Sequence, residues 1–139
     1  MATQNKTQKT SASVPSFIAA VKDPERRKDC VTLSRMLKKA TGKSGKLWGT
    51  NIVGFGDGRF KGASREVDWF LIGFAPRKDN LTLYLGFNLD SMKAELEDLG
   101  RHKRGLGCLY LRSLADVDVK VLEKMVVKTV KTMKAAALK

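Results

Sequence analysis

The sequence contains few of the residues that build metal and disulfide sites. Its 139 residues include two cysteines, Cys30 and Cys108, and one histidine, His102. A structural zinc site needs four nitrogen or sulfur ligands and a disulfide framework needs several cysteine pairs, so both are excluded. The longest apolar run, Trp69–Ala75, is far too short to cross a bilayer. Met1–Thr10 lacks the apolar segment of a secretory signal, and we expect a cytoplasmic protein without a cofactor.

Acidic residues are scarce as well. The chain has 14 Asp and Glu residues against 27 Lys and Arg, which leaves a formal net charge of +13. Such an excess often serves only solubility, but it suits a negatively charged partner when the basic residues gather in one place. With 42% hydrophobic residues, the chain can build one core.

We expect a disordered polar tail, Met1–Ala12, followed by a single domain over residues 13–139. Two helices should open the domain. Ser13 and Asp23 each lie just before a proline in the first helical turn, where the missing N–H of proline is harmless. Gly42 should end the second helix.

Three β-rich runs follow the helices, and a hairpin turn at Asp79–Asn80 should join the second run to the third. The runs are Ile52–Gly56, Val67–Phe74 and Leu81–Leu85. The second run shows little polar alternation, which indicates a central strand covered on both faces.

The last third of the chain predicts a short helix capped by Ser91 and ended by Gly100, then a strand at Cys108–Leu111 and a long helix from near Asp116. One face of that last helix carries Lys120, Lys124, Lys128 and Lys131. Adjacent strands with helices before and after them favour a small α+β domain with a mainly antiparallel sheet packed against helices.

Several blocks of the sequence occur in a characteristic order: Trp48–Gly49, Ile52–Gly56, Asp68–Phe70, Gly73–Lys78, Leu99–Lys103, Gly107–Tyr110 and Leu114–Asp118. In these blocks the chain resembles the YdhG-like family, a domain of unknown function found mostly in bacteria. The resemblance runs from about Val14 to Met125 and implies a small α+β domain. One branch of that family includes a frataxin-like protein proposed as an intracellular iron chaperone, so the resemblance implies iron handling as an alternative function.

Basic residues gather in two loops. Arg77–Lys78 follows a proline at a strand end, and Arg101–Gly107 joins a helix to a strand. The glycines of the second loop permit positive φ, so that successive N–H groups can converge on an anion. Arg binds phosphate or carboxylate in bidentate fashion, and Lys acts as a point charge. We expect the two loops to meet around one anion; the alternative is a solvated basic loop at a helix end.

The ligand-binding residues that we expect are Trp48, Arg59, Arg77, Lys78, Arg101, His102, Lys103, Arg104, Gly105 and Gly107. Trp48, Phe55 and Trp69 are candidates for an aromatic wall beside them, although aromatics at strand positions more often belong to the core. His102 has no neighbouring carboxylate to orient it, and no nucleophilic serine motif is present. The sequence therefore favours binding over catalysis and predicts no metal ligands.

Three functions remain. We favour a non-catalytic binding module for a small anionic ligand or an acidic protein surface. The second is a frataxin-like intracellular iron-binding chaperone. The third is sequence-independent nucleic-acid binding through the lysines of the last helix, which is possible but not favoured. We expect no membrane partner.

Overall fold

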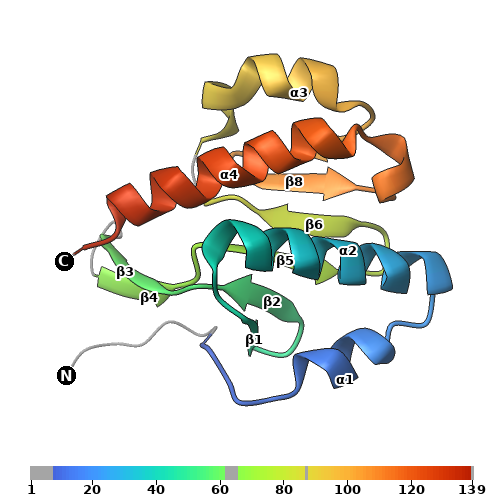
Figure 1. Ribbon diagram of the computed structural model, residues 1–139, viewed down its shortest axis with the longest axis horizontal. Helices are drawn as coiled ribbons and strands as arrows, with labels where there is room; N and C mark the ends of the chain where they lie inside the picture. The colour runs from blue at the N-terminus through green and yellow to red at the C-terminus, as the bar shows by residue number, and fades with distance from the viewer. Residues whose placement is uncertain (1–7, 62–65, 87, 139) are drawn as a thin grey trace.

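The computed structural model describes residues 8–61, 66–86 and 88–138 (Figure 1). In this part of the chain the helices are α1 (Val14–Ala19), α2 (Pro24–Thr41), α3 (Lys93–Leu99) and α4 (Val119–Ala136), with short 3₁₀ turns η1 (Leu89–Met92) and η2 (Leu114–Asp116). The strands are β1 (Gly45–Trp48), β2 (Ile52–Phe55), β3 (Gly58–Lys61), β4 (Glu66–Trp69), β5 (Ile72–Pro76), β6 (Leu81–Tyr84), β7 (Lys103–Arg104) and β8 (Cys108–Leu111).

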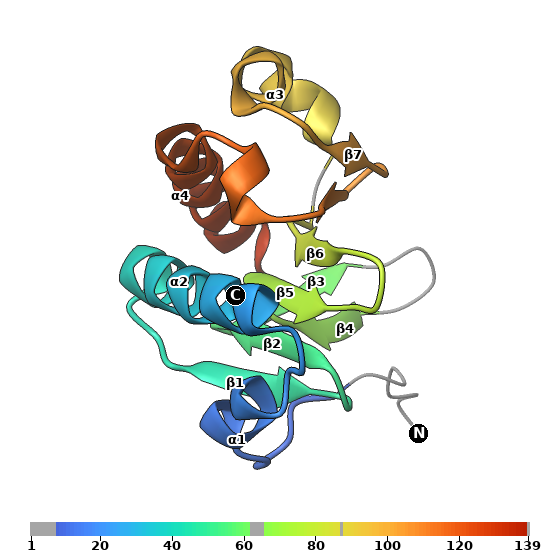
Figure 2. The ribbon, with the colours of Figure 1, turned by 90° about the vertical axis from the view of Figure 1, so that its right-hand side faces the viewer.

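Six of these strands form one antiparallel sheet in the order β1-β2-β5-β6-β8-β7, and β3 pairs with β4 in a separate hairpin. Helices α2 and α4 lie on one face of the sheet (Figure 2). This architecture confirms the expected α+β fold with a mainly antiparallel sheet. Among the described residues, no helix combines the length and the apolar character that crossing a membrane requires.

Most helix ends follow the expected signals. The side chains of Ser13 and Asp23 accept hydrogen bonds from first-turn N–H groups of α1 and α2. Gly42 ends α2 in the left-handed conformation with φ 70°, which a residue with a side chain adopts only at a cost. The expected cap at Ser91 is wrong: Asn88 caps η1, and this turn continues directly into α3.

Several elements differ from expectation, and β1, β3 and β7 have no counterpart among the expected strands. The run Val67–Phe74 is two strands, because the N–H of Leu71 bonds to the carbonyl of Phe55 at 3.1 Å and returns the chain from the hairpin to β2. The two residues of β7 are too few to show a strand period in the sequence. Asp118, rather than Asp116, caps the last helix.

The segment Met1–Ala12, expected to be disordered, lies partly within the described residues, and there it is ordered. Thr10 donates its backbone N–H to Leu47 at 2.8 Å, and Gln8 accepts from the N–H of Gly49 at 2.9 Å. Residues 8–10 therefore lie along β1, whose edge offers unpaired backbone groups. Residues 1–7 lie outside the described part.

Side chains alternate between the two faces of the sheet, as the strand period requires. The face under the helices carries fully buried residues of the main core, among them Val53, Phe74, Leu83 and Leu109. The opposite strand face, called the second face below, carries a mixed set of aromatic, polar and very small residues. By strand alternation and pairing register this set includes Trp48, Gly54, Gly73, Thr82, Tyr84, Lys103, Cys108 and Tyr110.

Two glycines make room for rings on the second face. Gly54 and Gly73 are paired across β2 and β5. A Cβ on Gly54 would lie 2.7 Å from the indole of Trp48, and one on Gly73 would lie 2.9 Å from the ring of Phe70. Because both glycines lack a side chain, the rings of Trp48 and Phe70 can lie directly on the strands. The centroids of these two rings are 5.4 Å apart.

Candidate functional site

The two basic loops do not form one shared cradle. The β5–β6 turn that carries Arg77 and Lys78 lies at the Leu81 end of β6, beside Leu111. Gly105–Gly107 lies at the other end of β6, where the carbonyl of Gly107 accepts from the N–H of Leu85 at 2.9 Å. Arg101, at the start of the second loop, donates its N–H to the carbonyl of Asp116 near the Arg112 end of β8. Gly105–Gly107 are separated from Arg77 and Lys78 by the length of β8, so the expectation that both reversals surround one anion is wrong for these glycines.

The side chain of Arg77 nevertheless spans this separation. Its guanidinium donates a hydrogen bond to the hydroxyl of Tyr84, at the far end of β6, and its Cζ lies 5.9 Å from the Tyr84 ring centroid. Its positive charge also acts on the thiol of Cys108, which is paired with Tyr84 on β8. Arg77 thus brings the charge of the turn onto the second face.

Four further side chains share this region with Arg77. Tyr84 lies opposite Cys108, and Tyr110 lies opposite Lys103 on β7, so all four project to the same side of the sheet. Tyr84, Cys108 and Tyr110 are half-buried, whereas the side chain of Lys103 is exposed. We call Arg77, Tyr84, Lys103, Cys108 and Tyr110 the Arg77 cluster.

The Arg77 cluster is rich in hydrogen-bond donors. It offers a guanidinium, an ammonium, two phenols and a thiol, and none of its five residues is a carboxylate. Burial raises the pKa of the Cys108 thiol, and the hydrogen bond with Tyr110 and the charge of Arg77 oppose this only in part. The thiol is therefore protonated at neutral pH, and a protonated thiol is a weak nucleophile.

An aromatic wall adjoins the cluster. Phe70 lies at the centre of this wall, with its ring centroid 5.8 Å from that of Tyr84 and 4.3 Å from that of Trp69. Trp48 packs behind Phe70 and is only 2% exposed, so it supports the wall without reaching the cluster. The expectation that Phe55 belongs to the wall is wrong, since its ring stacks on Phe74 in the main core.

A separate hollow of about 440 Å³ borders Trp48. The hollow lies between residues 8–9 and the β3–β4 hairpin, and Asp57 and Asp68 line it. Lys9 closes part of it through an ion pair with Asp57 at 2.5 Å. Trp48 thus borders a pocket away from the basic loops, and the acidic groups of this pocket do not suit the anion for which Trp48 was expected.

Ion pairs occupy two of the arginines that the sequence assigned to the site. Arg59 lies on the hairpin, 3.3 Å from Asp68 and 3.8 Å from Glu66. Arg104 lies opposite Leu109, so its side chain belongs to the face of β7 that the helices cover. It forms an ion pair with Asp90 at 2.5 Å, and this pairing lowers the pKa of the Asp90 carboxyl. Neither arginine joins the cluster.

The remaining expected residues lie around its edges. The charge of Arg101 acts on Asp116. The Nδ1 of His102 lies 2.8 Å from the carbonyl of Gly100. Gly105 lies beside Tyr110, since a Cβ there would be 3.4 Å from the hydroxyl. The carbonyl of Lys78 accepts a hydrogen bond from Arg26, and the carbonyl of Gly107 accepts one from the N–H of Leu85.

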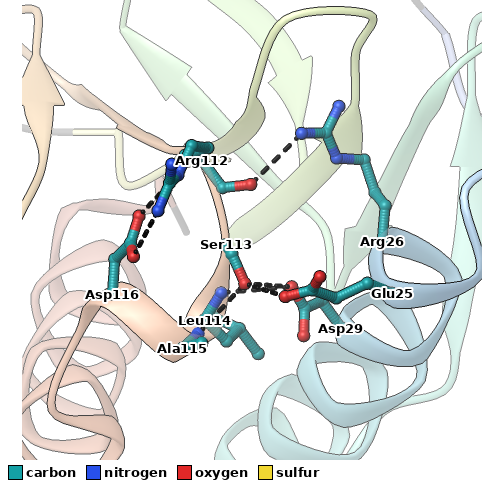
Figure 3. A network of polar contacts seen from close by, with 8 residues as sticks. All are labelled: Glu25, Arg26, Asp29, Arg112, Ser113, Leu114, Ala115 and Asp116. Carbon is teal, nitrogen blue, oxygen red and sulfur yellow. Dashed lines mark hydrogen bonds and ion pairs between the residues drawn. The ribbon is translucent and has the colours of Figure 1, made fainter.

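A polar network braces the turn that carries Arg77, and Figure 3 shows the part of it that joins Arg26 to Arg112. Arg26 of α2 donates to the carbonyls of Arg77, Lys78 and Arg112. One guanidinium therefore ties the β5–β6 turn to the end of β8. The sequence contained no local signal for this role, because Arg26 lies about fifty residues before the turn.

The same network joins η2 to α2. The hydroxyl of Ser113 donates to Glu25 at 2.8 Å, and the N–H of Leu114 donates to Asp29 at 3.1 Å (Figure 3). Arg112 forms two hydrogen bonds with Asp116, which lower the pKa of that carboxyl. These contacts hold the end of β8 against the start of α2.

Metal binding finds no support in the described residues. No group of three or more His, Cys, Asp or Glu side chains in this part of the chain is placed to hold a metal ion. The carboxylates beside Ser113 are engaged in the brace between η2 and α2.

Comparison with known proteins returned no match to any protein-family model, to any curated protein or to any solved structure. The site is therefore defined by the geometry of this chain alone. The resemblance to the YdhG-like family stays a prediction.

Proposed function

We propose that this chain is a YdhG-like, non-catalytic binding module for a small anionic ligand, which it holds on the second face through the Arg77 cluster. The observation that supports this most is the position of the Arg77 guanidinium. It leaves its own turn, lies over the Tyr84 ring and reaches the neighbourhood of Cys108. A guanidinium in that place can donate two parallel hydrogen bonds to a phosphate or carboxylate.

The neighbours of Arg77 support the same ligand class. Lys103 adds a second positive charge, and the hydroxyls of Tyr84 and Tyr110 add neutral donors on adjacent strands. The adjoining rings of Phe70 and Trp69 reduce the access of water on one side, which strengthens the interaction between charges. The brace from Arg26 reduces the entropy lost when the turn is ordered by a ligand.

Thermal unfolding with pyrophosphate or citrate tests this proposal, with sodium chloride at equal ionic strength as the reference. We expect both anions to raise the melting temperature of the native chain and to lose this effect in Arg77→Ala. Lys78→Ala is the matched control, since it removes the same charge from the same turn and should keep the effect. Equal losses in the two variants, or no stabilisation of the native chain, would refute the proposal.

The two alternative functions, nucleic-acid binding and iron binding, can be distinguished by the salt dependence of binding and by calorimetry. A duplex held by six to ten phosphate contacts should weaken by about 10³ to 10⁵ between 50 and 200 mM salt. A small anion in a partly buried site should lose much less affinity, because buried charges are less screened.

For iron, anaerobic calorimetry with ferrous ion is the measurement, and saturable heat would favour the chaperone alternative.

A further inference from the structure

The two long helices leave a groove on the side of the molecule opposite the Arg77 cluster. Helices α2 and α4 run side by side in the same direction on the covered face of the sheet (Figure 1). The groove between them has a volume of about 580 Å³. Its apolar lining consists of Met36, Ala40, Val119, Val126 and Val127. Met36 and Ala40 are four residues apart on α2, and Val119 lies seven and eight residues before Val126 and Val127 on α4, so each helix contributes one stripe.

The lip of the groove exposes an apolar side chain. Val127 is 59% exposed, whereas its neighbour Val126 is 1% exposed and belongs to the main core. A single exposed valine needs no explanation, but one that continues the apolar lining of a groove marks a surface suited to a partner.

The rims of the groove are basic. Arg35 and Lys39 line it from α2, and Glu123 is the one acid among its lining residues. Lys120 and Lys124 line an adjoining hollow on α4, which shares Glu123 and Val127 with the groove. The two hollows together are lined by five basic residues and two acids, Glu123 and Glu95, and Glu95 is already paired with Lys128.

The shape and the charge together favour one occupant. We propose that the groove between α2 and α4 binds an amphipathic helix of a partner protein whose apolar stripe is flanked by Glu or Asp. The apolar stripe of such a helix meets the valines and Met36, while its acids meet Arg35 and Lys39. This proposal is independent of the anion site, which uses the other face of the sheet.

Two other occupants fit less well. A membrane surface is flat on this scale, whereas most of the apolar lining lies in a hollow between charged rims. A second copy of this chain would bring two basic surfaces together, and each chain carries a net charge of +13. A convex acidic helix meets neither difficulty.

The probe for this proposal is a labelled synthetic peptide of about five helical turns, with Leu on one face and Glu on both flanks. Fluorescence anisotropy measures its binding to the full chain. We expect saturable binding that weakens with salt, and binding at least about tenfold weaker for a peptide with Lys in place of Glu. Absence of saturable binding by the Glu peptide would overturn the proposal.

Two matched pairs of variants locate the binding. Val127→Glu should weaken the Glu peptide at least about tenfold, whereas Leu106→Glu, which alters an equally accessible residue far from the groove, should not. Arg35→Glu with Lys39→Glu should weaken it further, whereas Lys22→Glu with Lys61→Glu changes the net charge equally and should not. Equal effects within either pair would mean unspecific attraction and would overturn the proposal.

The alternative occupants supply the remaining outcomes. Vesicles of anionic phospholipid that bind more tightly than the peptide, with loss in Val127→Glu, would assign the groove to a membrane surface instead. Sedimentation equilibrium that shows a dimer of the native chain and a monomer of Val127→Glu would assign it to a second copy. Either result overturns the peptide proposal. A native chain that is monomeric and does not bind the vesicles, but binds the Glu peptide, supports it.

Discussion

The two faces of the central sheet use the same strands for different purposes. On β6, Leu81 and Leu83 face the helices and are fully buried, while Thr82 and Tyr84 face the opposite side. On β8, Leu109 faces the helices, and Cys108 and Tyr110 belong to the Arg77 cluster. The covered face holds the fold together by burial, whereas the second face carries donors and rings.

We expect stability and ligand binding to be separable in this chain. Because the strand period is two, a substitution on one face leaves the other face's side chains in place. Variants of buried residues on the covered face should therefore change the free energy of unfolding, and variants within the Arg77 cluster should change ligand binding with little effect on stability. The predictions below test that separation in order of decreasing effect.

Leu83→Ala should have the largest effect. Leu83 is 0% exposed in the main core, and removing its buried methyl groups leaves a cavity under the helices. We expect a loss of about 2–5 kcal/mol in the free energy of unfolding, measured by urea denaturation. A loss below about 1 kcal/mol would show that the covered face is not the main source of stability.

Cys30 should make the covered face sensitive to alkaline pH. Burial raises the pKa of this thiol to about 11, with Asp29 adding to the effect and Arg26 opposing it. Below about pH 9 the thiol is protonated in both the folded and the unfolded chain. Above that pH the unfolded chain loses the proton first, so stability falls between about pH 9 and 11, by about 2–3 kcal/mol in all.

Cys30→Ala removes this contribution and is the comparison that isolates it from other groups that titrate at high pH. Urea denaturation at several pH values should show a shallower alkaline decline for the variant than for the native chain. Parallel declines would contradict the assignment to Cys30.

Gly73→Ala should disturb the second face from within. The added Cβ would meet the Phe70 ring and the carbonyl oxygen of Val53, both at 2.9 Å, and the backbone oxygen cannot move aside freely. We expect a loss of about 1–3 kcal/mol together with a changed tryptophan emission spectrum, since Phe70 touches both tryptophans. Unchanged emission would mean that the rings do not rest on this glycine.

Tyr84→Phe should have the smallest effect on stability and a clear effect on binding. The change removes the hydroxyl that accepts from Arg77 and keeps the ring that Arg77 lies over. We expect less than about 1 kcal/mol in unfolding, because the hydrogen bond lies at the surface. Stabilisation by pyrophosphate should nevertheless decrease; an unchanged response would remove Tyr84 from the proposed site.

Local signals in the sequence predicted much of the fold. Ser13, Asp23 and Gly42 mark helix ends because capping depends on neighbouring residues alone. The hairpin at Asp79–Asn80 is local in the same way. The break at Phe70–Leu71 was missed because it depends on a hydrogen bond to Phe55, and that partner comes from another strand.

For the candidate site, the sequence identified residues but not their arrangement. Arg77 and Lys103 were expected and lie in the Arg77 cluster, whereas Arg59 and Arg104 were expected and form ion pairs elsewhere. Tyr84 and Tyr110 were missed as site residues. Their alternation with buried leucines was visible, and it would have placed them on the face opposite the core.

Composition and local periodicity alone determined the positive charge, most helix ends and the α+β class, since these depend on neighbours within a few residues. Only the tertiary structure decided which charges are free and which are paired. Arg77 reaches Tyr84 because β6 runs antiparallel to β5 after the turn. Arg26, on the distant helix α2, bonds to the carbonyls of that turn. The strand order β5-β6-β8-β7 brings these groups together, and long-range pairing of that kind leaves no local trace in the sequence.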